Sequence, residues 1–164
     1  MLNFAERIIV ALAKNKVEFV VVGGISAVLH GAPIITRDID LCYRRVDENL
    51  VRLADALKPF QPRLRDLPEG LPNLFDVHSL RLGTNFTLIA DEQALDLLGI
   101  MSAIGGYESI IDRTIEMDVG GYKVRVLSLE DLIRTKRAAG RMKDLAVLPT
   151  LEATLQMQRE LEQP

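Results

Sequence analysis

The sequence predicts one α/β (or α+β) domain, in which helices flank a mixed sheet of about five strands. Three observations support this class. The 164 residues fit one domain, and 48% of them are hydrophobic, which is enough to bury a sizeable core. Short β-branched runs alternate along the chain with stretches of helical periodicity. Because neither a repeat nor a linker divides the chain, residues 1–164 are interpreted as one domain that ends in a helical pair at about 129–162.

The first two elements are predicted from capping and apolar periodicity. Asn3 and Glu6 have the spacing of a capping box, and apolar residues follow at helical intervals, so a helix is expected over residues 3–15. The run VEFVVV at 17–22 is β-branched and almost wholly apolar, which is typical of a strand covered on both faces.

A glycine pair separates this strand from the elements that follow. Gly23-Gly24 is expected to end the strand, and a short helix is expected over 26–30. The alternating sequence DIDLCY predicts a strand over 38–43. A helix is expected over 47–57, where prolines end it.

The middle of the chain is the hardest part to assign. Residues 58–82 contain four prolines, which disfavour a long helix or strand, so this segment is interpreted as a loop or lid. Strands are expected over 86–90 and 95–100, and a short helix over 107–113.

The last third of the chain begins with a hairpin. Residues 114–119 and 122–127 alternate in polarity on either side of a glycine pair, which is a turn signal between two strands. A capping pattern predicts a helix over 128–140. A last helix begins near Met142 and is expected to kink at Pro149.

Composition and charge exclude several classes of protein. The apolar content excludes a disordered chain, and a net charge of -3 argues against a protein that coats nucleic acid by bulk charge. No run approaches the roughly 18 consecutive apolar residues of a membrane span, and Glu6 and Arg7 interrupt the stretch that a signal peptide would need. Cys42 is the only cysteine, so no internal disulfide is possible and we expect a reducing, cytoplasmic setting. Cys42 itself is interpreted as a small buried hydrophobe.

Two carboxylates share one face of a predicted strand. Asp38 and Asp40 are two residues apart, so their side chains leave the same face, while Ile39 and Leu41 face the core. An exposed strand with acidic residues turned outward would produce the same alternation. The pattern alone therefore leaves both interpretations open.

A third carboxylate lies in an apolar run. Asp96 stands within ALDLLGI, where an unpaired carboxylate carries a large desolvation cost and needs a cation, a hydrogen-bond network or a raised pKa. If its strand lies beside that of Asp38 and Asp40, three carboxylates converge, and Mg²⁺ would relieve their repulsion. The alternative is that Asp96 caps a strand end or pairs with an arginine.

Two further features have the chemistry of phosphate ligands, and the first is the glycine pair. A strand, Gly23-Gly24 and a helix bring backbone N–H groups close to an anion, and the hydroxyl of Ser26 could add a contact. An ordinary tight turn is the alternative interpretation.

The second feature is a basic cluster within ten positions, formed by Arg134, Lys136, Arg137, Arg141 and Lys143. Lys136 falls on the apolar stripe of its helix, so it either extends to solvent or reaches into a cleft and holds a phosphate. Asp144 is positioned to orient Lys136 or Lys143. Without the carboxylates, the cluster would be interpreted as a solvated face.

Taken together, these residues resemble the signature of the DNA polymerase beta-like nucleotidyltransferase superfamily. Gly23-Gly24, thirteen intervening residues and then DIDL at 38–41 are similar to its two-part motif, with Asp96 as the carboxylate of a later strand. The segments GGISAVLHGAPIITRDIDL and VRVLSLEDLIRTKRAAGRMKDL look most like the small prokaryotic branch of minimal and abortive-infection toxin nucleotidyltransferases. The resemblance covers most of residues 17–148 and is weakest over the proline-containing segment.

The resemblance implies a minimal sheet flanked by helices, with a metal-dependent site at its edge. In such a site Asp38 and Asp40 would bind two Mg²⁺ ions, with Mn²⁺ as an alternative, and Asp96 would bind the ion that activates the acceptor hydroxyl. Two ions stabilise both the attacking and the leaving oxygen of an in-line displacement. The three aspartates are therefore the expected catalytic and metal-binding residues.

The expected nucleotide- and phosphate-binding residues combine the glycine pair, the hydroxyl after it and part of the basic cluster. They are Gly23, Gly24, Ser26, Lys136, Lys143 and Asp144. The resemblance implies that the glycine pair holds the triphosphate. It also implies that Lys136 binds the phosphates, with Lys143 and Asp144 in support. The chain departs from better-known members in having Gly-Ile-Ser where they have a tighter Gly-Ser start, so its contact with the triphosphate is expected to differ.

These residues predict an enzyme that moves an NMP group from an NTP to a hydroxyl and releases pyrophosphate. The acceptor is a tRNA, a protein or a small molecule, and the toxin-like resemblance favours a tRNA or a protein in a toxin–antitoxin or phage-defence setting. Because no large C-terminal domain follows, acceptor choice is expected to depend on residues 58–82, a second copy of the chain or a partner protein. The alternatives are a nucleotide-binding module with little turnover and an antitoxin-type component of a complex.

Overall fold

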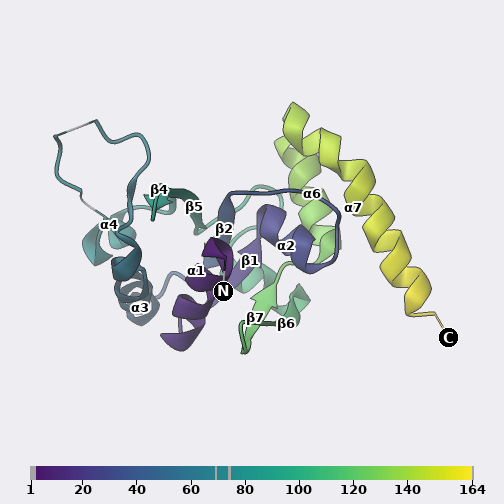
Figure 1. The fold of residues 1–164 in the computed structure, drawn as a ribbon, viewed down its shortest axis with the longest axis horizontal. Helices are drawn as coiled ribbons and strands as arrows, with labels where there is room; N and C mark the ends of the chain where they lie inside the picture. The colour runs from purple at the N-terminus through teal and green to yellow at the C-terminus, as the bar shows by residue number, and fades with distance from the viewer. Residues whose placement is uncertain (1–2, 69, 74, 164) are drawn as a thin grey trace.

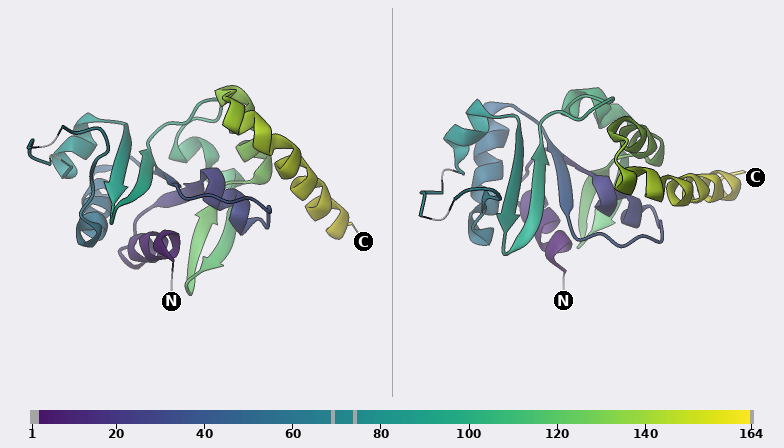
Figure 2. Two further views of the ribbon diagram at one scale, coloured as in Figure 1. Left: turned by 45° about the horizontal axis from the view of Figure 1, so that its top comes forward. Right: turned by 90° about the horizontal axis from the view of Figure 1, so that it is seen from above.

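The structure is a computed structural model that describes residues 3–68, 70–73 and 75–163. These residues form a mixed sheet with helices on both faces (Figure 1, Figure 2). The strands are β1 (Phe19–Val22), β2 (Ile39–Tyr43), β3 (Arg63–Leu64), β4 (Asn85–Ala90), β5 (Gln93–Leu98), β6 (Ile115–Val119) and β7 (Tyr122–Val126). Their order across the described sheet is β3-β4-β5-β2-β1-β7-β6.

The mixed α/β class is confirmed, but the sheet is larger than predicted. The described residues form seven strands rather than about five. The six candidate strands are all present, and the additional strand, β3, has only two residues, which is too short for an alternating pattern to show. The strand β2 pairs with β5 and β1 pairs with β7 in parallel, whereas the other neighbours are antiparallel.

The described residues also contain the helices α1 (Phe4–Lys14), α2 (Gly23–Leu29), α3 (Asp47–Leu57), α4 (Val77–Leu82), α5 (Tyr107–Ile110), α6 (Leu129–Ala139) and α7 (Met142–Leu161). Asn3 and Glu6 form the predicted capping box of α1. The helix α7 continues on both sides of Pro149 and extends away from the sheet, with the C-terminus at its far end (Figure 1). None of the helices described here is long and apolar enough to cross a membrane.

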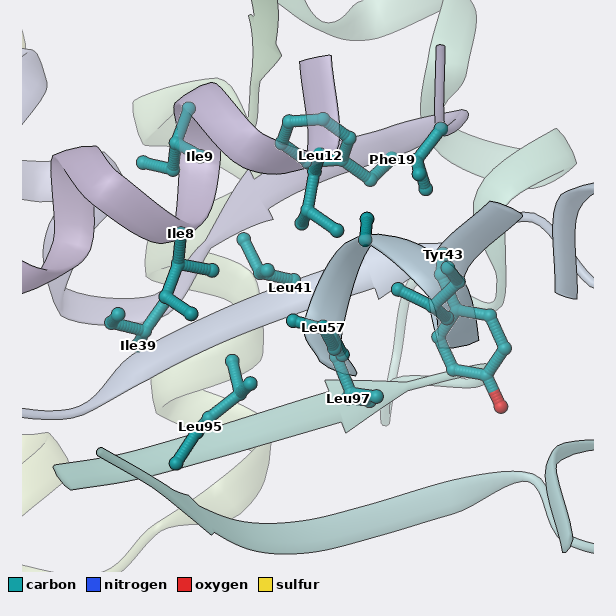
Figure 3. Packing of buried hydrophobic residues seen from close by; sticks show 14 of the residues in the cluster. Ile8, Ile9, Leu12, Phe19, Ile39, Leu41, Tyr43, Leu57, Leu95 and Leu97 are labelled. Carbon is teal, nitrogen blue, oxygen red and sulfur yellow. The ribbon is translucent and has the colours of Figure 1, made fainter. Parts of the chain in front are cut away.

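One face of the sheet packs against α1, α3 and α4. The buried side chains of β2 on this face are Ile39, Leu41 and Tyr43, as the alternation predicts. Figure 3 shows them beside Leu95 and Leu97 of β5, with aliphatic side chains of α1 and α3 packed over them. This core fixes β2 against β5.

The opposite face packs against α2, α5, α6 and α7. Val20 and Val22 of β1 lie in this second core with Cys42 of β2. Cys42 is fully buried, which confirms its interpretation as a small hydrophobe, and burial raises the pKa of its thiol to about 12. Asp40 alternates with Ile39 and Leu41 and therefore leaves β2 on the side of this second core.

The segment 58–82 is only in part the loop that its prolines suggested. It has no long helix or strand among its described residues, as predicted, but it contains a 3₁₀ turn (Lys58–Phe60), the strand β3 and the helix α4. The strand β3 pairs with β4, and the fully buried side chain of Leu80 anchors α4 to the first core. Pairing and burial with distant residues therefore stabilise short elements between and after the prolines. Residues 69 and 74 of this segment lie outside the described residues.

The helix α2 begins earlier than predicted. It starts at Gly23 rather than at Ser26, so the glycine pair forms the first turn of the helix instead of only ending the strand. Gly23 has a φ of +62°, a left-handed conformation that glycine adopts without a steric penalty. This conformation lets the chain turn directly from β1 into α2.

A buried asparagine ties three segments of the chain together. In the first turn of α3, the side chain of Asn49 accepts a hydrogen bond from the backbone N–H of Glu18 over 2.7 Å. It donates to the backbone carbonyls of Glu18 (3.0 Å) and Arg44 (2.8 Å). Because Asn49 is fully buried, water cannot replace these bonds, and they hold the start of β1 and the end of β2 against α3.

We predict that Asn49→Ala lowers the free energy of unfolding by about 2–3 kcal/mol, because it removes the hydrogen-bond partner of the Glu18 backbone N–H and of the Arg44 carbonyl. Urea denaturation followed by circular dichroism measures the change. Gln156→Ala removes an exposed side-chain hydrogen bond and is the matched control, with an expected change below about 0.5 kcal/mol. An equal effect of the two substitutions would contradict the role assigned to Asn49.

Candidate active site

Three aspartates converge where β2 and β5 lie side by side. Asp40 is the register partner of Asp96 in this parallel pair, which confirms that the two strands are neighbours. Asp38 directly precedes β2. All three line one cavity of about 330 Å³, called the carboxylate cavity below. The carboxylates are therefore brought together by the register of two strands that are far apart in the sequence.

The carboxylate cavity gathers most of the predicted site residues. In addition to the three aspartates, Gly23, Gly24, Lys136 and Lys143 line it. Two predicted residues do not line this cavity: Ser26 and Asp144 are fully buried.

Burial and mutual repulsion change the proton affinity of the two paired carboxylates. Burial raises the pKa of Asp40 to about 6, the charge of Asp96 adds to the shift, and Lys136 opposes it. The pKa of Asp96 is also raised, mainly by burial, although the nearby guanidinium of Arg65 opposes the shift. Without a bound cation, the site therefore holds its negative charge at an energetic cost.

The third carboxylate has an arginine partner. Nη2 of Arg65 donates a hydrogen bond to Oδ1 of Asp96 over 2.9 Å. This contact is the alternative that the sequence left open for Asp96. The sequence did not indicate which arginine, because Arg65 lies in the segment interpreted as a lid and directly follows the two-residue strand β3.

The donor chemistry of the aspartates fits the metal ions that the resemblance implies, but the donors are not gathered around one point. Among the described residues, no three His, Cys, Asp or Glu side chains lie close enough together to hold a single ion. Asp96 contacts Arg65 instead. Carboxylate oxygens that repel one another in a cavity are the donors that Mg²⁺ and Mn²⁺ accept, so the residues fit by charge and ligand type.

The glycine pair makes room for neighbouring side chains. A Cβ added to Gly23 would lie 2.1 Å from Oδ2 of Asp40, and one added to Gly24 would lie 2.6 Å from Oγ1 of Thr36. The carboxylate of Asp40 thus lies directly against the start of α2. The buried hydroxyl of Ser26 donates to the carbonyl of Gly23 over 2.7 Å, and this hydrogen bond stabilises the first turn of α2. A phosphate contact of Ser26 stays a prediction.

Asp144 organises the basic side of the site. Nζ of Lys136 donates to Oδ1 of Asp144 over 2.9 Å, and Nε of Arg141 donates to Oδ2 over 2.5 Å. Burial alone would raise the pKa of Asp144, but the hydrogen bonds from Arg141 and Lys136 outweigh it and lower the pKa. Asp144 therefore stays ionised and holds two cations toward the cavity, one of which, Arg141, the sequence reasoning did not assign to the site.

A second cavity of about 250 Å³ adjoins the first. The two share Gly23, Asp40, Leu132, Lys136 and Arg141. The second cavity is also lined by Asp144 and by apolar side chains that include Leu98, Ile100 and Met101. Both cavities therefore combine carboxylates with cations, and the second adds an apolar wall from β5 and the residues that follow it.

Arg65 and Arg141 are the site residues that the sequence analysis missed. The signal for Arg141 was present, since it belongs to the basic cluster and lies three residues before Asp144. Arg65 carries no such signal, because its place beside Asp96 depends on the pairing of β3 with β4 and of β4 with β5.

Comparison with protein families identifies one match. The family described as "Nucleotidyltransferase of unknown function (DUF6036)" matches residues 3–157. No curated protein matches the chain.

Solved structures of several proteins share the fold, and three of these proteins are compared below. The antibiotic-resistance factor ANT(2")-Ia, in complex with adenylyl-2"-tobramycin, has a TM-score of 0.61 at 14% identity, covering 93% of this chain and 88% of that chain. A candidate nucleotidyltransferase from Thermotoga maritima has a TM-score of 0.52 at 20% identity, covering 87% of this chain and 86% of that chain. An antigenic nucleotidyltransferase-like protein from Paracoccidioides brasiliensis has a TM-score of 0.50 at 17% identity, covering 95% of this chain and 78% of that chain.

The raised pKa of Asp40 predicts a pH-dependent stability. Between its ordinary value of 3.8 and about 6, Asp40 is protonated in the folded protein and ionised in the unfolded chain. Stability therefore falls as the pH rises through this window. We expect Asp40→Asn to be more stable than wild type at pH 7, by on the order of 1–3 kcal/mol, and close to wild type at pH 4.

Urea denaturation at pH 4, 5, 6 and 7, without divalent cations, tests this expectation. Asp118→Asn, on the exposed hairpin of β6 and β7, is the matched control and should follow wild type at every pH. A wild-type stability that rises from pH 4 to pH 6 relative to Asp40→Asn would refute the assigned shift.

Gly23→Ala is predicted to displace the Asp40 carboxylate and abolish nucleotide binding, because the new methyl group would overlap it. Gly31→Ala is the matched control: Gly31 also has a left-handed φ, of +87°, but an added Cβ meets nothing within 4 Å. Both variants should lose about 1 kcal/mol of stability from backbone strain. Calorimetric titration with an NTP and Mg²⁺ measures binding, and equal affinity in the two variants would count against the contact.

Proposed function

Because this chain belongs to the DUF6036 family of nucleotidyltransferases, we propose that it transfers an NMP group from an NTP to a hydroxyl acceptor in a reaction that depends on divalent cations. The observation that carries the proposal is the register of Asp40 beside Asp96, with the Asp40 carboxylate against the start of α2. This arrangement supports a site in which a triphosphate and two cations meet at the same aspartate.

The aspartates divide between the two reacting groups. Asp38 and Asp40 would hold the cations that contact the triphosphate, as the resemblance implies; both line the cavity, and Asp40 lies directly against the glycine turn of α2. Asp96 lies on the other side of Asp40 and is assigned to the acceptor hydroxyl. When bound, Mg²⁺ or Mn²⁺ supplies positive charge to the attacking and leaving oxygens.

The basic residues are assigned to the phosphates. Lys136 and Arg141 are held by the buried carboxylate of Asp144, so their cations are positioned before a ligand arrives. Lys143 lines the same cavity. In the reaction, the acceptor hydroxyl gives up its proton to solvent water and its oxygen attacks the α-phosphorus. The bond from that phosphorus to the leaving oxygen breaks, and pyrophosphate departs toward these cations.

The acceptor carries a hydroxyl group, and two observations bear on its class. The toxin-like resemblance of the sequence favours a tRNA or a protein, in a toxin–antitoxin or phage-defence setting. The structural neighbour ANT(2")-Ia is bound to adenylyl-2"-tobramycin, which favours a small molecule. Incubation with labelled NTP and tRNA, cell protein or an aminoglycoside distinguishes the three classes by the fraction that retains the label.

The contact of Asp96 with Arg65 favours a second candidate function, a nucleotide-binding module with little turnover. In such a protein the third carboxylate would have only a structural role. The two functions differ in whether Asp96 is needed for transfer, which the following experiment measures.

We predict that Asp96→Asn lowers the rate of NMP transfer by a factor on the order of 10³ and leaves NTP affinity within a few fold of wild type. Calorimetric titration with each of the four NTPs, with and without Mg²⁺, identifies the preferred base and measures affinity in wild type, Asp96→Asn and Asp40→Ala. Binding should depend on Mg²⁺ and vanish in Asp40→Ala.

The matched control is Asp118→Asn, which should leave both binding and transfer unchanged. Transfer by Asp96→Asn at the wild-type rate would refute the assigned role of Asp96. Binding of NTP without any detectable transfer in wild type would support the binding module.

A further inference from the structure

Arg65 belongs to a row of residues that crosses the sheet. The backbone N–H of Arg65, just after β3, donates to the carbonyl of Thr87 on β4. Thr87 is the register partner of Asp96 on β5, and Asp96 is the partner of Asp40 on β2. The guanidinium therefore reaches across one intervening strand, a distance of about 10 Å between the backbones, to contact Asp96.

The contact with Asp96 uses only part of the hydrogen-bonding capacity of the Arg65 guanidinium. Nη2 of Arg65 is its one hydrogen-bond donor to Asp96, whereas Arg81 binds Asp47 through both Nε and Nη2. Nε of Arg65 is buried and has no hydrogen-bond partner among the described residues. A buried donor without a partner destabilises this position of the side chain, so an alternative position is energetically close.

The segment that carries Arg65 is attached weakly. The strand β3 has two residues and, at the end of the described sheet, pairs only with β4. The guanidinium can therefore leave Asp96 without disturbing the β2–β5 pairing that places the carboxylates.

We propose that Arg65 is a built-in counter-cation that competes with a divalent cation for Asp96, so that an ion binds Asp96 only after Arg65 has released it. The proposal rests on the proposed metal-dependent function. In the ligand-free chain, Arg65 neutralises the carboxylate that lies beside Asp40. Arg65 occupies Oδ1 of Asp96, and its charge repels a cation from the same carboxylate, so the two compete for this group. Arg65 is thus a positioning residue that couples the 58–82 segment to metal loading.

The test measures Mn²⁺ binding to the nucleotide-free protein, with free Mn²⁺ counted by its electron paramagnetic resonance signal. In Arg65→Gln, Mn²⁺ should bind more tightly than in wild type by a factor of roughly five, the size expected for a partly exposed ion pair. Arg65→Met keeps the apolar part of the side chain and should show the same gain, which guards against a folding defect in the first variant.

Arg63→Gln is the matched control, because Arg63 lies on β3 two residues before Arg65, carries the same charge and does not contact Asp96. It should leave Mn²⁺ affinity unchanged. In an Asp96→Asn background, Arg65→Gln should no longer increase affinity, since the two substitutions act through one contact.

The outcomes separate this inference from the function on which it rests. Unchanged or weaker Mn²⁺ binding in both Arg65 variants, with measurable binding in wild type, overturns the competition but leaves the metal site in place. A gain that persists in the Asp96→Asn background also overturns it, because the gain then comes from bulk charge. Absence of Mn²⁺ binding in wild type and both Arg65 variants overturns the metal-dependent function and this inference together.

Discussion

The pairing of Asp40 with Asp96 in the β2–β5 register is the constraint on which the rest of the site depends. Burial of these two carboxylates on neighbouring strands is the main cost and raises the pKa of both groups, and the charge of Asp96 adds to the shift at Asp40. The apolar core on the other face, where Leu41 and Leu97 pack beside the same strands, offsets this cost and keeps the register fixed. A fold that stabilises such a pair can present it to cations.

The positive charges around this pair come from two directions. On the α6–α7 side, the buried carboxylate of Asp144 fixes Lys136 and Arg141, so these cations face the cavity in the ligand-free chain. On the β4 side, Arg65 reaches Asp96 from a short strand at the end of the described sheet. The anchor of the first arrangement, Asp144, is fully buried. The anchor of the second, Asp96, is only half-buried and is the carboxylate that we propose binds a cation.

Membership of the nucleotidyltransferase family and the shared fold agree with this division of charges. In the proposed reaction, the carboxylates would hold cations at the transferred phosphoryl group, and the fixed basic residues would neutralise the leaving pyrophosphate. The adjoining cavity, with its apolar wall, shares Asp40 with the carboxylate cavity.

By itself, the sequence determined the features that depend on neighbouring residues. These are the capping box of α1, the hairpin of β6 and β7, the apolar alternation of β2, and the residue types of the glycine and aspartate motif. Only the tertiary structure decided which of these residues meet. Asp40 and Asp96 are 56 positions apart, and their register follows from packing on both faces of the sheet. The two-residue strand β3, the bonds of Asn49 and the contact of Arg65 with Asp96 likewise depend on distant partners that no local pattern encodes.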